Sequence, residues 1–134
     1  MRRDSLYING EWVEANGDGV IEVVNPATEE TIGSVPVGSQ SDVDAAVTAA
    51  RDAFTSWSMS SIEERIEVLN KLSAAIKDNT EELAQTITAE VGTPIGYSRM
   101  AMVGTPRVVT RSYAKMLESF EWEHEVRNSL IIKE

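Results

Sequence analysis

Cysteine is absent from this 134-residue sequence, and histidine occurs once, as His124. Without cysteine, these residues can form no disulfide, thiolate zinc site or cysteine nucleophile. The serines at positions 58, 60 and 61 have no second histidine near them in the sequence, so a Ser-His-Asp arrangement lacks its parts. These absences exclude the commonest nucleophilic and zinc chemistries from the chain.

His124 stands in the stretch EWEHE, residues 121–125. At strand spacing, the three glutamates share one face and His124 lies on the other. A metal site needs its carboxylates and imidazole to converge, whereas here they alternate. We interpret this stretch as a solvated acidic edge.

Basic residues are scarce: 12 Lys and Arg stand against 22 Asp and Glu, which gives a net charge of −10. Such a surface repels phosphate groups, so we expect neither nucleic acid nor an anionic membrane as a partner. No apolar run approaches the roughly 18 residues that span a bilayer. The two N-terminal arginines have no apolar stretch behind them, so they do not form a signal peptide. We expect a cytoplasmic protein.

Phosphate-cradling glycine motifs are also missing, since neither G-x-G-x-x-G nor G-x-x-x-x-G-K-[ST] occurs. We interpret Gly92, Gly96 and Gly104 as caps and packing positions. The acidic pairs at 63–64 and 81–82 fall in the first turns of expected helices, where negative charge favours the helix dipole. Three methionines, at positions 100, 102 and 116, are expected to pack a core.

What is present indicates an α/β chain with strands in its first third. With 42% apolar and 25% charged residues, the composition is that of a globular protein. Asn9-Gly10 between short β-rich runs predicts a hairpin with a type I′ turn. Segments 20–26 and 31–38 complete an extended region over about 6–37. Because Pro36 has no N–H to donate, the segment that contains it is not expected to be a central strand.

The period then becomes helical, and we expect four amphipathic helices over about 41–120. The first carries Ser41 and Asp44 as a capping box, and the second carries Ser61 and Glu64. A third helix starts near Asn79, with Glu82 at the box position, and stops at Gly92. The fourth has Pro94 in its first turn, and Gly104 and Pro106 predict a kink or two pieces in it.

The sequence ends in NSLIIKE, residues 128–134, which is strand material without an obvious partner. A strand must pair its backbone amides with a neighbour. We therefore expect a chain that has been cut, with the hairpin partner of this strand beyond residue 134.

A series of motifs resembles one family from Leu6 to Glu134. The motifs are YINGEWVE, NPATEETIG, DVDAAV, the Ala-Ala-Arg…Ala-Phe…Trp run, ITAEVGTPIG, TRSYA and NSLIIKE. Their order and spacing are similar to the N-terminus of the NAD(P)-dependent aldehyde dehydrogenase superfamily. One departure is Thr93, where lysine is common in the family.

The resemblance implies an oxidoreductase that converts an aldehyde to a carboxylic acid through a cysteine thioester, with NAD or NADP as cofactor. It implies a single partial domain over 1–134, in which 1–126 belongs to the cofactor-binding domain and 127–134 begins the oligomerisation arm. The family's catalytic and dinucleotide-binding residues would lie further on, so none is assigned here. The fragment alone is expected to be inactive and to bind no cofactor.

The resemblance also implies three supporting roles for residues of this chain. Val24 and Glu90 would hold a monovalent cation, and Ala101 and Thr105, one helical turn apart, would face the substrate tunnel. The arm of a homo-oligomer, dimer or tetramer, would contain the last seven residues: Asn128, Ser129, Leu130, Ile131, Ile132, Lys133 and Glu134.

An alternative from another class is a self-contained acidic helical interaction module without enzymatic activity. In that case the four helices would close on one another, whereas a segment of an enzyme would expose a large apolar face. The sequence leaves open which aldehyde is oxidised, whether NAD or NADP is used, and whether the assembly is a dimer or a tetramer.

Overall fold

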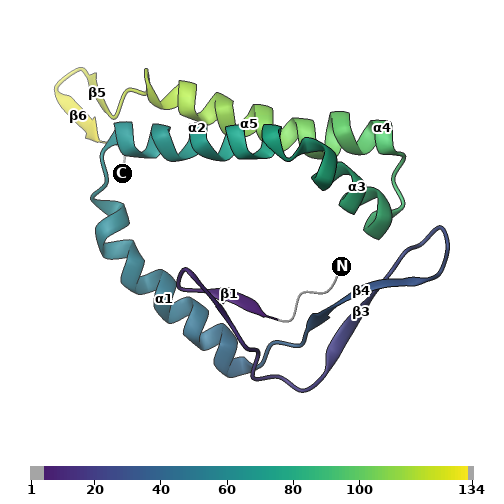
Figure 1. Ribbon diagram of the computed structural model, residues 1–134. Helices are drawn as coiled ribbons and strands as arrows, with labels where there is room; N and C mark the ends of the chain where they lie inside the picture. The colour runs from purple at the N-terminus through teal and green to yellow at the C-terminus, as the bar shows by residue number, and fades with distance from the viewer. Residues whose placement is uncertain (1–4, 133–134) are drawn as a thin grey trace.

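The computed structural model describes residues 5–132, which form three separate strand pairs and a set of helices (Figure 1). The strands are β1 (Leu6–Ile8), β2 (Glu11–Val13), β3 (Val20–Val24), β4 (Thr31–Pro36), β5 (Glu123–Val126) and β6 (Ser129–Ile132). The helices are α1 (Gln40–Ser58), α2 (Ile62–Asp78), α3 (Thr80–Val91), α4 (Ile95–Tyr97), the π-helical segment η1 (Ser98–Val103) and α5 (Gly104–Leu117). The predicted α/β class is confirmed.

The first hairpin forms as local sequence predicts. β1 and β2 pair antiparallel around Asn9 and Gly10, which have φ of 55° and 82°. Positive φ at both positions is the requirement of a type I′ turn. Tyr7 and Trp12 face each other across the strands, with ring centroids 5.1 Å apart.

The second strand pair, β3–β4, is closed by a wide turn over residues 25–30. The Asn25 side chain accepts a hydrogen bond from the backbone N–H of Ala27 at 2.9 Å, and Glu29 takes a φ of 61°. A register shift between Val23 and Val24 marks a bulge. Pro36 ends β4 in this two-stranded sheet, as expected for a proline that cannot serve a central strand.

The first helix starts two residues earlier than the sequence predicts. Ser39, not Ser41, is the N-cap of α1, and its capping-box partner is Asp42 rather than Asp44. Both serine–acid pairs fit the box pattern. The earlier pair forms because Asp42 also binds Asn16, from outside the helix.

The next two helices follow the prediction in most respects. Ser61 and Glu64 form the expected capping box of α2, and Glu67 pairs with Lys71 at 2.6 Å on its exposed side. Gly92 ends α3 in the left-handed conformation. The expected box at the start of α3 is wrong, because the Asn79 side chain donates instead to the carbonyl of Ala75.

The fourth helix is one continuous run, not two pieces. Pro94 precedes α4 as its N-cap, and the π-helical segment η1 joins α4 to α5 without a break. A proline inside a helix collides with the carbonyl four residues before it, here Met102. The wider π turn, which includes Met102, gives that carbonyl room and keeps the helix whole.

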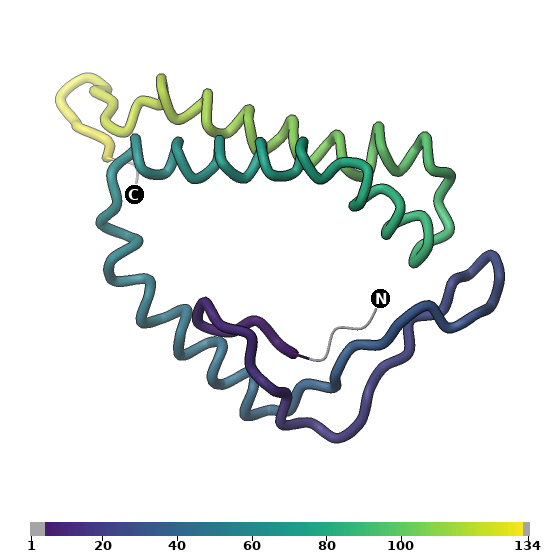
Figure 2. The backbone as a smooth tube through the Cα atoms, in the orientation of Figure 1, coloured from purple at the N-terminus to yellow at the C-terminus, as the bar shows by residue number. Residues whose placement is uncertain are grey.

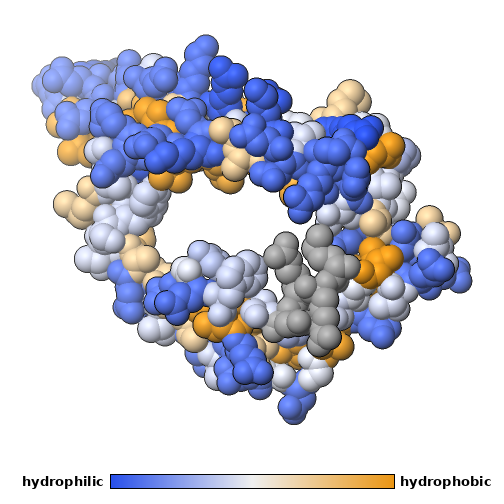
Figure 3. All heavy atoms as spheres, viewed as in Figure 1, coloured by the Kyte–Doolittle hydropathy of each residue, from blue (hydrophilic) through white to orange (hydrophobic). Residues whose placement is uncertain are grey.

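The helices do not close into a bundle. α2 packs along α5 and α3 packs on η1, whereas α1 runs away from this layer and contacts β1 (Figure 1). The backbone traces a ring in which the β3–β4 turn approaches the α3–α4 connection (Figure 2). The opening persists when all atoms are drawn (Figure 3).

The core of this open fold is small. Among the described residues, the buried apolar side chains are Ala84, Val103 and Ala114. Met100, Met102 and Met116, expected in a core, are all exposed, and so are the α1 residues Phe54 and Trp57. The apolar stripe of α2 is partly covered by α5, but the stripe of α1 has no helix over it.

Candidate functional site

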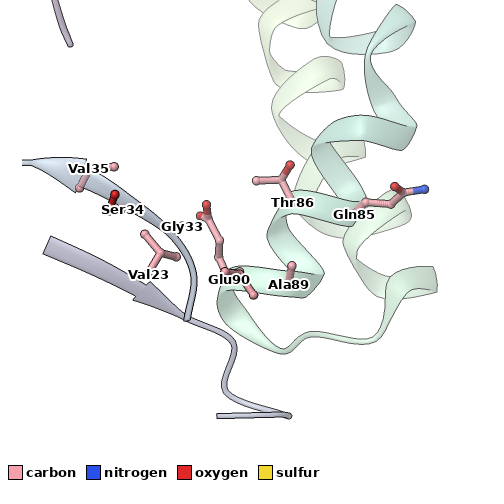
Figure 4. A pocket seen from close by; sticks show the side chains of 9 residues that line it. Val23, Gly33, Ser34, Val35, Gln85, Thr86, Ala89 and Glu90 are labelled. Atoms are coloured by element: carbon pink, nitrogen blue, oxygen red, sulfur yellow. The ribbon is translucent and has the colours of Figure 1, made fainter. Parts of the chain in front are cut away.

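The last turns of α3 face the β3–β4 sheet across a cavity of about 260 Å³. Its lining comprises Val23, Ile32, Gly33, Ser34 and Val35 of the sheet and Gln85, Thr86, Ala89 and Glu90 of the helix. Figure 4 shows Glu90 directed towards the sheet and Gln85 directed away from it. Glu90 is the only charged side chain of this lining.

A close contact beside this cavity joins sheet and helix. Gly92 has a φ of 77°, and a Cβ placed on it would lie 2.8 Å from Cγ of Pro26. A side chain at position 92 is therefore disfavoured both by the left-handed backbone and by Pro26. Glycine here lets the β3–β4 turn rest on the end of α3, which closes the ring and brings the two walls of the cavity together.

The predicted cation residues lie at this junction. Glu90 lines the cavity, and Val24 follows the lining residue Val23 directly after the bulge. Within residues 5–132, no group of three or more His, Cys, Asp or Glu side chains could hold a metal. A single carboxylate does not supply the ligand set that Zn²⁺ or Ca²⁺ needs.

The predicted tunnel residues lie in the composite helix. Ala101, half-buried, belongs to η1, and Thr105, exposed, belongs to α5. Because a π turn holds one more residue than an α turn, the two are not separated by a plain α-helical turn. Their spacing in the sequence therefore does not show whether Ala101 and Thr105 lie on the same face of the helix.

Three hydroxyl groups meet where η1 begins. The Ser98 side chain is fully buried, and its oxygen lies 2.9 Å from Thr88 Oγ1 and 2.7 Å from Thr93 Oγ1. This cluster ties α3, the connecting loop and η1 together. Sequence reasoning missed it, because serine and threonine give no periodic apolar signal.

A bidentate ion pair also joins α3 to η1. Arg99 Nε and Nη2 lie 2.7 and 2.8 Å from the two carboxylate oxygens of Glu81. This pairing, with a further hydrogen bond from Gln85, lowers the pKa of Glu81 to about 2, and it raises the pKa of Arg99. The two parallel hydrogen bonds fix the orientation of the Arg99 guanidinium relative to the Glu81 carboxylate as well as the distance between them. From the sequence alone, Glu81 is expected only to complement the helix dipole.

The most strongly bound carboxylate is Asp42, which is 5% exposed. It accepts hydrogen bonds from the backbone N–H of Ser39 at 2.7 Å and from the Asn16 side chain at 2.6 Å. These hydrogen bonds lower the pKa of Asp42 to about 2. The bond from the Ser39 backbone has the largest effect, and the bond from the Asn16 side chain has the next largest. These bonds anchor the loop before β3 to the first turn of α1, which is a structural task.

The elbow between α1 and α2 is held by Arg65. Its guanidinium donates to the carbonyl of Ser58 at 3.0 Å and to Ser60 Oγ at 3.0 Å, and it lies 5.9 Å from the ring centroid of Trp57. A cation at a helix C-terminus and over an aromatic face is favourable in both respects. Arg65 therefore fixes the direction in which α1 leaves the helical layer.

The terminal strand has a partner within the chain, contrary to the expectation that its partner lies beyond residue 134. β6 pairs antiparallel with β5 around a two-residue turn at Arg127 and Asn128, with Ile131 opposite His124. The extended conformation expected for the EWEHE stretch is confirmed by β5, whereas its pairing with the terminal strand is not predicted by the sequence. Lys133 and Glu134 lie outside the described residues.

This terminal hairpin still has open edges. All eight strand residues are exposed. In a two-residue hairpin the pair flanking the turn is hydrogen-bonded, and the pattern alternates from there. The register therefore points the N–H of Ile131 towards β5 and the N–H groups of Leu130 and Ile132 outwards.

The comparison with known proteins decides the family. The sequence model of the aldehyde dehydrogenase family matches residues 12–132. The chain belongs to the aldehyde dehydrogenase family. A curated relative from Staphylococcus aureus (strain USA300), whose name places it among the aldehyde dehydrogenases, is 39% identical over 130 residues, which are 96% of this chain and 27% of the relative.

Solved aldehyde dehydrogenases share the fold. The enzyme of Bartonella henselae superposes with a TM-score of 0.90 at 28% identity, over 96% of this chain and 27% of that one. Aldehyde dehydrogenase C of Pseudomonas syringae, a cysteine-to-alanine variant in complex with NAD⁺ and octanal, gives 0.90 at 36% identity over the same shares. This aldehyde dehydrogenase chain thus spans about 27% of the length of these relatives.

No helix in the part of the aldehyde dehydrogenase chain that the structure describes is long and apolar enough to cross a membrane.

Proposed function

We propose that this chain is the N-terminal part of an NAD(P)-dependent aldehyde dehydrogenase subunit that oxidises an aldehyde to a carboxylic acid through a cysteine thioester. The nucleophile would be supplied by the rest of the subunit, because these residues include no cysteine. The chain alone would be catalytically inactive. Its task is to build one wall of the complete enzyme.

The observation that carries this proposal is the amount of exposed surface. The chain exposes 10264 Å², whereas a globular monomer of this mass exposes about 6,900 Å². The excess includes the apolar stripe of α1, with Phe54 at 66% and Trp57 at 48% exposure. The chain matches only 27% of the length of its relatives, and the remainder of such a subunit would supply the cover.

The same surface argues against the self-contained helical module. A module would bury the apolar stripes of its helices against one another. Here α1 stands apart from the α2–α5 layer, and the core is limited to a few small side chains. The enzyme segment is therefore the better account.

The dinucleotide is assigned to no residue of this chain. NAD⁺ in the Pseudomonas syringae relative supports NAD or NADP as cofactor of the whole enzyme. When bound, the nicotinamide accepts a hydride from the substrate. The sequence holds none of the glycine motifs that cradle its phosphates, so this part of the subunit supports the enzyme through its scaffold.

Three roles are proposed for residues of this chain within the whole enzyme. Val24 and Glu90 contribute to a monovalent cation site beside the β3–β4 cavity. Ala101 and Thr105 line the approach of the aldehyde. Residues 128–134 belong to the arm that joins subunits in a homo-oligomer.

The β5–β6 hairpin indicates where the oligomerisation arm begins. β5 and β6 form one unit, so a boundary at 126/127 would fall at the turn between them. We propose that the arm includes β5 and begins at Glu123. The cytoplasmic location stays a prediction from the sequence.

The experiment is an assay of the full-length protein that carries these residues. With a panel of aldehydes, absorbance at the wavelength of the reduced nicotinamide should rise with NAD⁺ or NADP⁺. The isolated 134-residue chain, tested in parallel, should give no signal. A full-length protein without aldehyde-dependent reduction of either cofactor contradicts the proposal.

A further inference from the structure

Asparagine is followed by glycine at two places in this sequence, Asn9-Gly10 and Asn16-Gly17. An asparagine in such a pair loses its side-chain amide readily, because glycine has no Cβ to hinder attack by its backbone nitrogen on the asparagine side chain. The sequence does not distinguish the two pairs, since an acidic residue follows each of them. The structure places them in different surroundings.

The first pair is open to solvent. Asn9 and Gly10 are the exposed turn between β1 and β2. In a two-residue hairpin the hydrogen bonds nearest the turn belong to the flanking residues, so the Gly10 N–H is outside the ladder. A Cβ placed on Gly10 would meet no atom within 4 Å. Among residues 5–132, the Asn9 side chain has no hydrogen-bond partner.

Opening of this turn costs little free energy. β1 and β2 have three residues each, and a two-stranded hairpin of this size is marginally stable by itself. Attack on Asn9 needs such an opening, because its side chain and the Gly10 nitrogen must rotate towards each other. Exposed segments with few buried contacts open locally without global unfolding. The reactive geometry at Asn9 is therefore accessible from the folded protein.

The second pair is held in place. The Asn16 side chain donates to Asp42 Oδ1 at 2.6 Å, and the Asn16 backbone N–H donates to Asp42 Oδ2 at 3.0 Å. Hydrogen bonds to a carboxylate are stronger than those to a neutral acceptor. Gly17 lies against the backbone of Val37, whose carbonyl oxygen would collide with a Cβ at position 17. Rotation of the Asn16 side chain towards Gly17 must therefore first break its bond to Asp42.

We propose that Asn9 is a site of spontaneous deamidation and that Asp42 protects Asn16 from the same reaction. The Gly10 nitrogen loses its proton to solvent and bonds to Cγ of Asn9, while the bond from Cγ to Nδ2 breaks and the nitrogen takes up a proton and leaves as ammonia. Water then opens the cyclic imide at either carbonyl, which gives aspartate or isoaspartate at position 9. One water is consumed and one ammonia is released, so the reaction needs no oxidant, reductant or enzyme.

The modification affects the contact between the first hairpin and α1. β1 lies beside α1 (Figure 1), and a cavity of about 340 Å³ between them is lined by Tyr7, Ile8, Asn9 and Gly10 and by alanines of α1. Isoaspartate adds a methylene group to the main chain, so a two-residue turn no longer matches the register of its strands. Deamidation at Asn9 therefore weakens the packing of the hairpin on α1.

The test follows both sites in the full-length protein during incubation in mildly alkaline buffer, once folded and once unfolded in urea. Peptide mapping by mass spectrometry measures the loss of asparagine at each position. In the folded protein, Asn9 should react at least about tenfold faster than Asn16, the factor that one hydrogen bond to a charged group supplies. In urea the two rates should become similar, because the local sequences are equivalent.

A pair of variants identifies the protecting group. In the folded protein, Asp42→Ala should raise the rate at Asn16 by about tenfold and leave the rate at Asn9 unchanged. Asp44→Ala is the matched control, because Asp44 also lies early in α1 but accepts a hydrogen bond from Gln40 and not from Asn16. Circular dichroism checks that each variant is folded. If Asp42→Ala does not fold, the comparison of folded and urea-unfolded wild type decides.

The outcomes separate the two parts of the inference. Equal rates at Asn9 and Asn16 in the folded protein, a difference that persists in urea, or a folded Asp42→Ala variant with an unchanged rate at Asn16 would overturn the protection by Asp42. An Asn9 that stays intact in the folded protein while the unfolded protein reacts would overturn the deamidation site. Neither result depends on aldehyde oxidation, so the proposed function is tested separately.

Discussion

At the scale of single residues, a small number of specific contacts connect segments that are separated in the sequence. Asp42 binds the loop at Asn16, and Arg65 holds the elbow after α1. Gly92 leaves room for the ring of Pro26, which packs against it. The carboxylate of Asp42, with its pKa near 2, stays ionised at any neutral or mildly acidic pH. Each of these residues shapes the ring rather than taking part in chemistry.

Gly92 offers the sharpest residue-scale prediction. In the full-length protein, Gly92→Ala should lower the free energy of unfolding by about 2–3 kcal/mol, the sum of a left-handed backbone and a tight contact. The contact is the 2.8 Å approach of the new Cβ to Pro26. Denaturant unfolding measures the change.

The matched control is Gly96→Ala. Gly96 lies in α4, and a Cβ on it would meet no atom within 4 Å. Alanine is a better helix former than glycine, so stability should stay the same or rise slightly. Equal losses in the two variants would show that the contact between Pro26 and Gly92 has no special importance.

At the scale of elements, several local signals predict their elements correctly, although the box expected at the start of α3 does not form, and signals that depend on distant residues fail. Asn9-Gly10 and Ser61 with Glu64 determine a turn and a cap within a few residues, and both predictions are confirmed. The cap of α1 was misplaced because the choice between Ser39 and Ser41 depends on Asn16, which is distant in the sequence.

The sequence does not predict the π turn, for a related reason. Gly104 and Pro106 indicated an irregularity, but a break and a widened turn satisfy the same local constraints. What distinguishes them is the packing of η1 against α3, through hydroxyl groups and an ion pair. The cation, tunnel and arm roles came from the family resemblance alone, and they stay predictions.

The terminal hairpin gives the element-scale prediction. Leu130 directs its N–H to the open edge of β6, so Leu130→Pro should block pairing with another strand while sparing the bonds between β5 and β6. The full-length assembly should shift to smaller species, as measured by light scattering.

Glu125→Pro is the control for the opposite edge. It removes the outward N–H of β5, on the other side of the hairpin. We expect its assembly to keep the wild-type size, because the proposed contact uses β6. An unchanged size for Leu130→Pro would refute the assignment of β6 as the joining strand.

At the scale of the whole molecule, the decisive feature is a ring with little core. Helices that would be expected to bury their apolar stripes leave them in solvent, and the space-filling view retains the central opening (Figure 3). The sequence predicted the amphipathic helices but not their arrangement, because periodicity tells which face is apolar and not what covers it. In the complete enzyme, we expect the rest of the subunit to cover it.

The most direct test of this account is the behaviour of the isolated 134-residue chain in solution. Dye binding with ANS and thermal unfolding followed by circular dichroism should be measured on the same sample. The account predicts strong ANS binding and a broad, non-cooperative transition, since the apolar faces have no cover. Low dye binding together with a sharp cooperative transition would contradict it and would favour a self-contained module.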